Sequence, residues 1–261
     1  MQLTLQGRTA LITGGSRGLG LAMAERFANS GASVAIIGRD RAVLDAAAET
    51  VRAAGGGGAV VAHSCDVRDA AALSATHSAV VEALGPVDVL VNNAGTSAAG
   101  PFLEVSDEDW QNDLDLKLMA AIRLARLCIP DMQQQRWGRI INVLNIGAKA
   151  PGARTTPTTV SRAAGMALTK ALAAEMAPFG ILVNALNTGL LLTHQWERLH
   201  QERAPEVDFG EFMGRMADRI PVGRVGDPAE FANLACFLAS DAASYVTGTA
   251  INVDGGLSPV W

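Results

Sequence analysis

The chain has 261 residues, 49% of them apolar, which is enough for one large α/β domain with a sizeable buried core. Its formal net charge of -5 argues against nucleic acid or an anionic membrane as a partner. No apolar stretch reaches the roughly 20 residues that a membrane span needs. The chain also begins without the basic and then apolar segments of a signal peptide. We therefore expect a cytoplasmic protein.

Short, β-branched apolar runs alternate with amphipathic helical patterns along the whole chain. Such runs, when nearly continuous in apolar character, are typical of buried parallel strands. They occupy residues 8–13, 33–38, 59–65, 87–93, 139–144 and 181–186, with a last strand inside 249–256. The longest helical patterns cover 107–132 and 157–177. This alternation predicts an α/β fold, a single Rossmann-type domain over 1–261 whose doubly wound parallel sheet has helices on both faces.

One segment, from about 190 to 222, interrupts this alternation, and we expect it to form a helical lid over the strand ends. It is rich in apolar and aromatic residues that either wall a substrate pocket or pack the lid onto the sheet. They are Leu190, Leu191, Leu192, Trp196, Phe209, Phe212 and Met213.

The three cysteines, Cys65, Cys128 and Cys236, are far apart and odd in number. They have no metal-ligand spacing and suggest no disulfide framework. We expect buried free thiols in a reducing compartment, and no metal site.

A glycine-rich turn, TGGSRGLG at 13–20, follows the first expected strand and opens the first helix. Gly14, Gly18 and Gly20 would let the backbone turn sharply and approach a pyrophosphate at the helix N-terminus. A tight connection without a ligand is the simpler alternative. The strand before the turn and the helix after it favour a dinucleotide site.

The spacing T-G-x-x-x-G-x-G resembles the short-chain dehydrogenase/reductase superfamily, and the resemblance continues along the chain. NNAG at 92–95 is similar to the motif after the family's fourth strand, and Asp66-Val67 to its adenine-binding pair. The resemblance implies a dinucleotide cofactor bound by a set of residues spread over the chain. They are Gly14, Ser16, Arg17, Gly18, Leu19, Gly20, Arg39, Asp66, Val67, Asn93, Ala94, Gly95, Arg162 and Thr193.

The end of the second strand favours NADP(H) over NAD(H). An NAD site places an acidic residue there for the ribose 2′-hydroxyl, whereas this chain has Gly38 followed by Arg39. Arg17 and Arg39 would make charge-assisted contacts with a 2′-phosphate. Asp40 opposes this interpretation, because it could neutralise Arg39 or reach the ribose itself.

The catalytic positions of the family are all substituted. The resemblance places Thr158 at the family's Tyr position, Arg162 at its Lys position, Asn145 at its Ser position and Lys117 at its Asn position. No shift of the alignment restores them, because the single tyrosine, Tyr245, lies in the closing segment. The chain has only three lysines, at 117, 149 and 170.

The substitutes have different chemical abilities. The Thr158 hydroxyl is a poor acid, Arg162 stays protonated, and Asn145 offers an amide N–H to a carbonyl oxygen. Lys117 beside Arg162 would have a lowered pKa and could donate a proton near neutral pH. Alternatively, Lys117 only pairs with Asp113 or Asp115. Lys149 and His194 are further candidate proton donors. Alternatively, Lys149 is simply solvated and His194 is a lid residue without a catalytic role.

Three functions remain open. The first is an NADP(H)-dependent oxidoreductase with a rebuilt proton donor, acting on a small apolar carbonyl, imine or activated alkene. The second is a cofactor-binding sensor or partner subunit without turnover. The third is a lyase-type activity like that of halohydrin dehalogenases, which have an Arg at the Lys position. The resemblance also implies a homotetramer or homodimer that pairs through helices 107–132 and 157–177, with small residues Ala163, Ala164, Gly165 and Ala167 at the contact.

Overall fold

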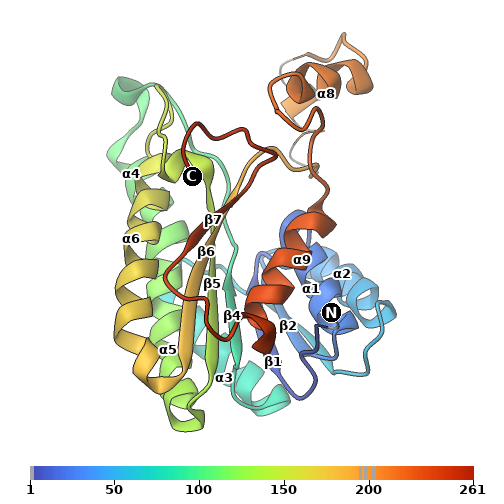
Figure 1. The fold of residues 1–261 in the computed structure, drawn as a ribbon, viewed down its shortest axis with the longest axis vertical. Helices are drawn as coiled ribbons and strands as arrows, with labels where there is room; N and C mark the ends of the chain where they lie inside the picture. Colours follow the sequence, from blue (N-terminus) through green and yellow to red (C-terminus); the bar gives the residue numbers. More distant parts are fainter. Residues whose placement is uncertain (1–2, 194–195, 197–198, 202–203) are drawn as a thin grey trace.

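The computed structural model describes residues 3–193, 196, 199–201 and 204–261. Their centre is a seven-stranded sheet in the order β3-β2-β1-β4-β5-β6-β7, with every neighbouring pair parallel (Figure 1). The strands are β1 (Thr9–Thr13), β2 (Ser33–Gly38), β3 (Val60–Ser64), β4 (Val89–Asn92), β5 (Gly138–Asn145), β6 (Ile181–Thr188) and β7 (Ala250–Val253). The predicted fold class is confirmed, and each expected strand is present with its ends moved by a few residues.

The strand order reverses between β1 and β4. The chain winds outward from β1 through β2 to β3, then crosses back to β4 on the other side of β1. In such sheets ligands bind at this reversal, outside the carboxyl ends of the strands. The glycine-rich turn after β1 and the NNAG segment at the end of β4 both lie there.

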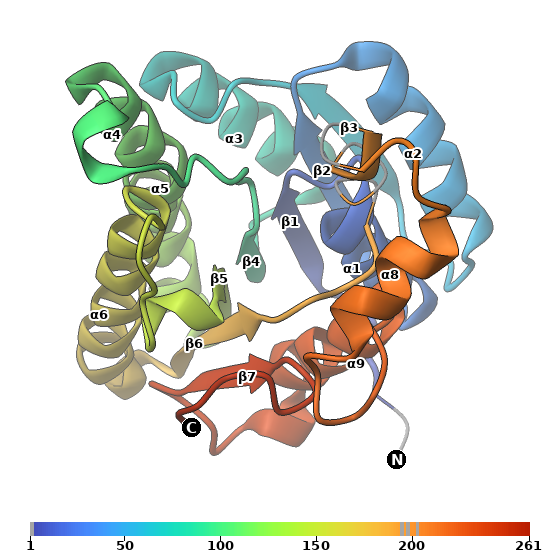
Figure 2. The ribbon, with the colours of Figure 1, turned by 90° about the horizontal axis from the view of Figure 1, so that it is seen from above.

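Helices cover both faces of the sheet (Figure 2). Two separate apolar clusters fill the space between helices and strands, one on each face. On one face lie α1 (Gly18–Asn29), α2 (Arg41–Ala53) and α9 (Pro228–Ala239), and on the other α3 (Ala70–Leu84), α5 (Ala120–Gln135) and α6 (Thr158–Met176). Burial on both faces explains why the strands are apolar at nearly every position.

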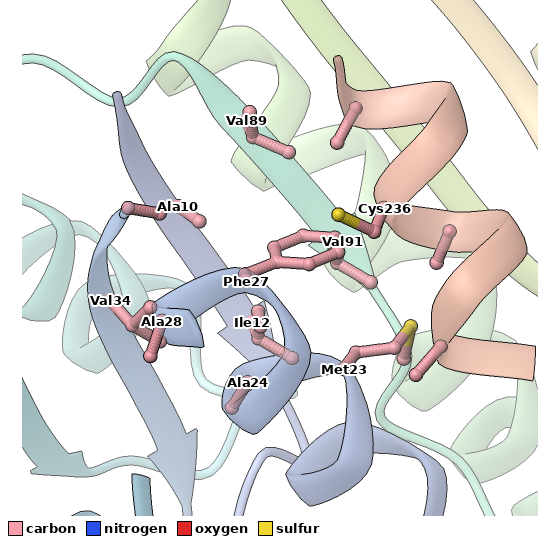
Figure 3. Close-up of a cluster of buried hydrophobic side chains, with 14 of the residues drawn as sticks. Ala10, Ile12, Met23, Ala24, Phe27, Ala28, Val34, Val89, Val91 and Cys236 are labelled. Atoms are coloured by element: carbon pink, nitrogen blue, oxygen red, sulfur yellow. The ribbon is translucent and has the colours of Figure 1, made fainter. Parts of the chain in front are cut away.

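The cluster under α1 and α9 contains one of the three cysteines. Phe27 and Met23 of α1 pack against Ile12, Val91 and Cys236 (Figure 3). All three cysteines are free and buried, as expected. Burial raises the pKa of the Cys236 thiol, so the side chain acts as an apolar packing group.

The expected long helix over 107–132 is interrupted. It consists of α4 (Asp107–Leu114), a five-residue π-helical turn (Asp115–Met119) and α5, which continues to Gln135. The buried residues around the break are charged: Asp113 just before it and Lys117 within it. The π turn carries Lys117, which is buried. Single π turns inside helices are frequent at functional sites.

The lid segment contains α8 (Phe209–Ala217), which stands above α9 in Figure 1. Its aromatic residues pack against one another: ring centroids are 6.4 Å apart for Trp196–Phe212 and 5.3 Å apart for His200–Phe209. The aromatic residues therefore form a small core of the lid itself, which neither alternative foresaw.

Across the described ranges, no helix is both long and apolar enough to cross a membrane. The same residues hold no group of three or more His, Cys, Asp or Glu side chains that could bind a metal ion.

Candidate active site

The glycine-rich turn has the shape that a phosphate site requires. Gly14 and Gly18 have φ values of +63° and +54°, a left-handed conformation that favours glycine. A side chain at Gly20 would collide with the Gly14 carbonyl oxygen. Arg17 precedes α1 without a side-chain cap bond, and the first turn of α1 has no acidic residue. The first N–H groups of α1 are therefore available to an anion.

The NNAG segment fixes this turn in place. The Thr13 hydroxyl accepts hydrogen bonds from the backbone N–H groups of Asn93 and Ala94, each at 2.9 Å. The Asn93 side-chain amide donates to the Thr13 carbonyl at 2.8 Å and also reaches the Gly14 carbonyl. Asn93 thus joins the carboxyl ends of β1 and β4, and its side chain is committed to the scaffold of the site.

The arginines predicted to read the 2′-phosphate lie where the sequence suggested. Gly38 ends β2 so close to Ser16 that an added Cβ would lie 3.2 Å from the Ser16 hydroxyl oxygen. Arg17 and Arg39 flank this point and are exposed. The Asp40 carboxylate caps α2 by accepting from the Val43 N–H at 3.2 Å. This cap gives Asp40 a structural role and leaves Arg39 at the surface.

Asp66 and Val67, which resemble the family's adenine-binding pair, lie after β3. The Asp66 carboxylate accepts from the Arg68 guanidinium at 2.6 Å, and these hydrogen bonds keep the pKa of Asp66 below its usual value. Val67 is buried among the apolar residues under α3 and α5. Thr193, which the resemblance includes among the cofactor-binding residues, is half-buried in the loop after β6.

Three of the four positions that the resemblance gives as substituted, Lys117, Thr158 and Arg162, lie close together at the start of α6. The Lys117 ammonium donates to the Thr158 hydroxyl at 3.0 Å, although 41 residues separate them. Thr158 also accepts from the Ala98 N–H at 3.0 Å. Both side chains are buried. Lys117 is therefore directed at the hydroxyl that occupies the family's Tyr position.

Arg162 lies one turn further along α6. It is half-buried, and its Nη1 donates to the Val143 carbonyl at 2.6 Å. Nη2 lies against Gly95, where any side chain would collide with it. Burial lowers the pKa of Arg162 to about 10, against the opposite effect of Asp113, so the guanidinium stays charged at neutral pH. The bare Gly95 makes room for an arginine.

Burial is also the main influence on Lys117. It lowers the pKa of Lys117 to about 8, assisted by the charge of Arg162 and opposed by the hydrogen bond and charge of Asp113. A lysine with this pKa is present in both protonation states near neutral pH, which suits a proton donor.

Asn145 ends β5 and is half-buried. Its Oδ1 is buried and has no hydrogen-bond partner among the described residues. Lys149, the second candidate donor, donates a hydrogen bond to the Ala250 carbonyl at 2.5 Å and so has a structural role. His194, the third, lies outside the described residues.

Two residues of this cluster were not identified as site residues from the sequence. Asp113, considered only as an alternative partner of Lys117, forms an ion pair with it and also accepts from Ser161 at 2.6 Å. The i,i+4 spacing of Asp113 and Lys117 on a helix was the available signal. Nothing in the sequence indicated Ser161, because its contact depends on how α6 packs against α4.

The start of the lid lines a cavity of about 180 Å³ with the end of β7. Leu190, Leu191, Val222 and Val253 are among the residues that line it. Arg224 at its rim is paired with Glu230 at 2.6 Å.

Comparison with known proteins identifies the family to which the chain belongs. The family described as enoyl-(acyl carrier protein) reductase matches residues 14–258. Oxidoreductase UcpA of Salmonella typhimurium is 37% identical over 258 residues, which cover 97% of this chain and 95% of that protein.

Two solved structures add detail. L-sorbose reductase of Gluconobacter frateurii, complexed with NADPH and L-sorbose, is 36% identical over all of both chains, with a TM-score of 0.96. A short-chain oxidoreductase of Pseudomonas aeruginosa, NADPH-bound and described as containing an atypical catalytic center, is 35% identical over 99% of each chain, with a TM-score of 0.92. The chain belongs to the short-chain dehydrogenase/reductase superfamily of oxidoreductases.

Proposed function

We propose that the protein is an NADP(H)-dependent oxidoreductase that reduces a small apolar carbonyl, imine or activated alkene, with Lys117 as its proton source. The observation that carries the proposal is the 3.0 Å hydrogen bond from the buried Lys117 ammonium to the Thr158 hydroxyl. NADPH-bound relatives and the exposed Arg17 and Arg39 support the choice of cofactor.

The residues of the chain fit this cofactor. The uncapped N-terminus of α1 and the left-handed glycines suit a pyrophosphate. The positive guanidinium of Arg162, beside Gly95, suits the nicotinamide ribose that the resemblance assigns to this position. Bound NADPH would supply the hydride.

The chain's own residues supply the proton. Thr158 is a weak acid alone, but its oxygen accepts a hydrogen bond from a cation, which strengthens it as a donor. Thr158 passes its hydroxyl proton to the substrate and takes one from Lys117. Lys117 is left neutral and must be reprotonated from solvent, after the enclosed network opens, before the next turnover. An imine or activated alkene needs less proton assistance than a simple ketone, which fits this weak acid.

A specific observation also supports a cofactor-binding sensor without turnover. The Lys117 and Asp113 side chains are 0% and 1% exposed, and the Thr158 hydroxyl already has donors from Lys117 and Ala98. A fully enclosed network of this kind would need a small rotation of Thr158 to reach a substrate. The lyase alternative has no comparable support, since halohydrin dehalogenases lack the cofactor loop that this chain has.

Calorimetry with NADPH and NADH, followed by a hydride-transfer screen over imines, ketones and activated alkenes, tests the proposal. We expect tight NADPH binding, weaker NADH binding and turnover that Lys117→Met reduces strongly. NADPH binding with no turnover across the screen would favour the sensor. Binding of neither cofactor would overturn both functions.

We also propose a homotetramer or homodimer. Ala163 and Ala164 of α6 are half-buried and Ala167 is exposed, which leaves small residues on its outer face. Gly165 does not belong to that face, because its Cα faces Leu144 of the sheet. Trp261 is fully exposed at the chain end. Sedimentation of a 27.1 kDa monomer would exclude the assembly.

A further inference from the structure

We propose that Asp113 is a positioning residue: held by Ser161, its carboxylate fixes the Lys117 ammonium against the Thr158 hydroxyl. This inference rests on the proposed function and deepens it, because it names the group that aims the proton source.

The first support is the way the two carboxylate oxygens divide their contacts. Oδ2 accepts from the Ser161 hydroxyl at 2.6 Å. Oδ1 pairs with the Lys117 ammonium and lies 3.5 Å from the Thr158 hydroxyl, which donates to it. Asp113 therefore contacts the Lys117 ammonium and the hydroxyls of Thr158 and Ser161. These contacts join the last turn of α4 to the first turn of α6.

The second support is that this arrangement is a costly way to join two helices. Removing two charges from water costs several kcal/mol per ion, and apolar side chains of similar size often stabilise such a contact as well or better. Asp113 and Lys117 are nevertheless buried together, each touching the Thr158 hydroxyl. The geometry thus points to orientation of Thr158 and Lys117 as the purpose of the pair.

The third support is the charge around Lys117. The groups that act on it are Asp113 on its own helix and Arg162 on α6, which lies across from it. Asp115, on the same π turn, is instead paired with Arg123 at 3.6 Å. Without Asp113, the buried Lys117 would face the positive charge of Arg162 alone. Lys117 would then lose its proton more readily, and its amine would no longer be held against the Thr158 hydroxyl.

A lysine side chain has several rotatable bonds and does not hold one position unaided. The π turn starts two residues after Asp113. The Lys117 side chain therefore projects from a turn that is wider than a regular α-helical turn. Ser161 fixes the carboxylate, the carboxylate fixes the ammonium, and the ammonium reaches Thr158. Each link comes from a contact between described, buried residues.

The small number of lysines allows a direct test that needs no turnover. With ¹³Cε-labelled lysine the protein gives three lysine signals, from Lys117, Lys149 and Lys170. The conservative variant K117R assigns the first. The pH titration of these signals in NADPH-free protein is compared between wild type, D113N and the matched control D115N.

We expect D113N to lower the titration midpoint of Lys117 by about one pH unit or more, equal to a tenfold change in its proton affinity. The titration midpoints of Lys149 and Lys170 should not change in D113N, and D115N should leave the midpoints of all three lysines unchanged. An unchanged Lys117 midpoint in folded D113N overturns the inference. If D113N does not fold, S161A takes its place, and we expect a smaller shift of Lys117 in the same direction; no shift in S161A would equally overturn it.

Kinetics give the second readout. With a substrate found by the screen, D113N should lower kcat at least tenfold and move the basic limb of the pH profile of kcat to lower pH. Its affinity for NADPH should stay within about twofold of the wild-type value. An unchanged limb and kcat overturn the positioning role. A wild-type protein without turnover whose Lys117 signal still responds to D113N would mean that the proposed function fails and the positioning of Lys117 stands.

Discussion

Lys117 on the π turn lies 3.0 Å from the hydroxyl of Thr158 on α6, 41 residues further along the chain. In this superfamily member the two residues stand where the resemblance expects an asparagine and a tyrosine. The contact joins two of the four substituted positions, Lys117 and Thr158, by a hydrogen bond. Its consequences can be measured.

Replacing Lys117 by methionine should lower kcat about 100-fold, the usual range for loss of a general acid. Methionine keeps the length and apolar body of the side chain, so the affinity for NADPH should change little. Steady-state kinetics and calorimetry measure the two quantities. Lys170→Met is the matched control, because Lys170 is exposed and its ammonium donates to the Gly248 carbonyl, at 3.4 Å. Equal kcat values for the two variants would contradict the role of Lys117.

The rate of reduction should depend on pH through Lys117. Its pKa is lowered to about 8, chiefly by burial, and reduction needs the protonated form. The rate should therefore be constant well below pH 8 and fall about tenfold per unit above it. Oxidation of the product should show the opposite dependence, because it needs neutral Lys117. A profile of kcat that is flat between pH 6 and 10 would exclude Lys117 as the donor.

Replacing Arg39 by alanine should weaken NADPH binding about 10-fold or more and leave NADH binding unchanged. A hydrogen bond to a charged group contributes roughly 1.5–3 kcal/mol, and only NADPH carries the 2′-phosphate. Calorimetry on both cofactors tests this. Arg41→Ala serves as the control, since Arg41 is also exposed near this corner but pairs with Asp45 at 2.9 Å. A parallel loss for NADH would show that Arg39 does not read the phosphate.

A methyl group at Gly20 should disrupt the phosphate turn. The added carbon would collide with the Gly14 carbonyl, which forces the turn to move at a cost of about 1–3 kcal/mol. We expect a lower Tm and at least a tenfold loss of NADPH affinity. Gly214→Ala in α8 is the control, because a side chain there meets no atom within 4 Å. Retention of full affinity in Gly20→Ala would show that the turn does not hold the cofactor.

The sequence by itself determined the fold and the glycine-rich turn after the first strand. Buried parallel strands are short apolar runs, and the spacing of Gly14, Gly18 and Gly20 follows from a local turn, so both depend on neighbouring residues only. For the same reason the sequence could suggest Arg39, and through the resemblance it could predict that Thr158 and Arg162 stand at the family's Tyr and Lys positions.

Only the tertiary structure decided what these substitutes do together. Lys117 could equally have pointed to solvent or paired with Asp115, since both outcomes satisfy the same local pattern. Its contact with Thr158, and the place of Asp113 and Ser161, depend on α4 and α6 packing side by side and on the π turn that rotates Lys117 inward. The chemistry of the site is therefore set by contacts between residues about 40 to 50 positions apart, whose energies no local pattern contains.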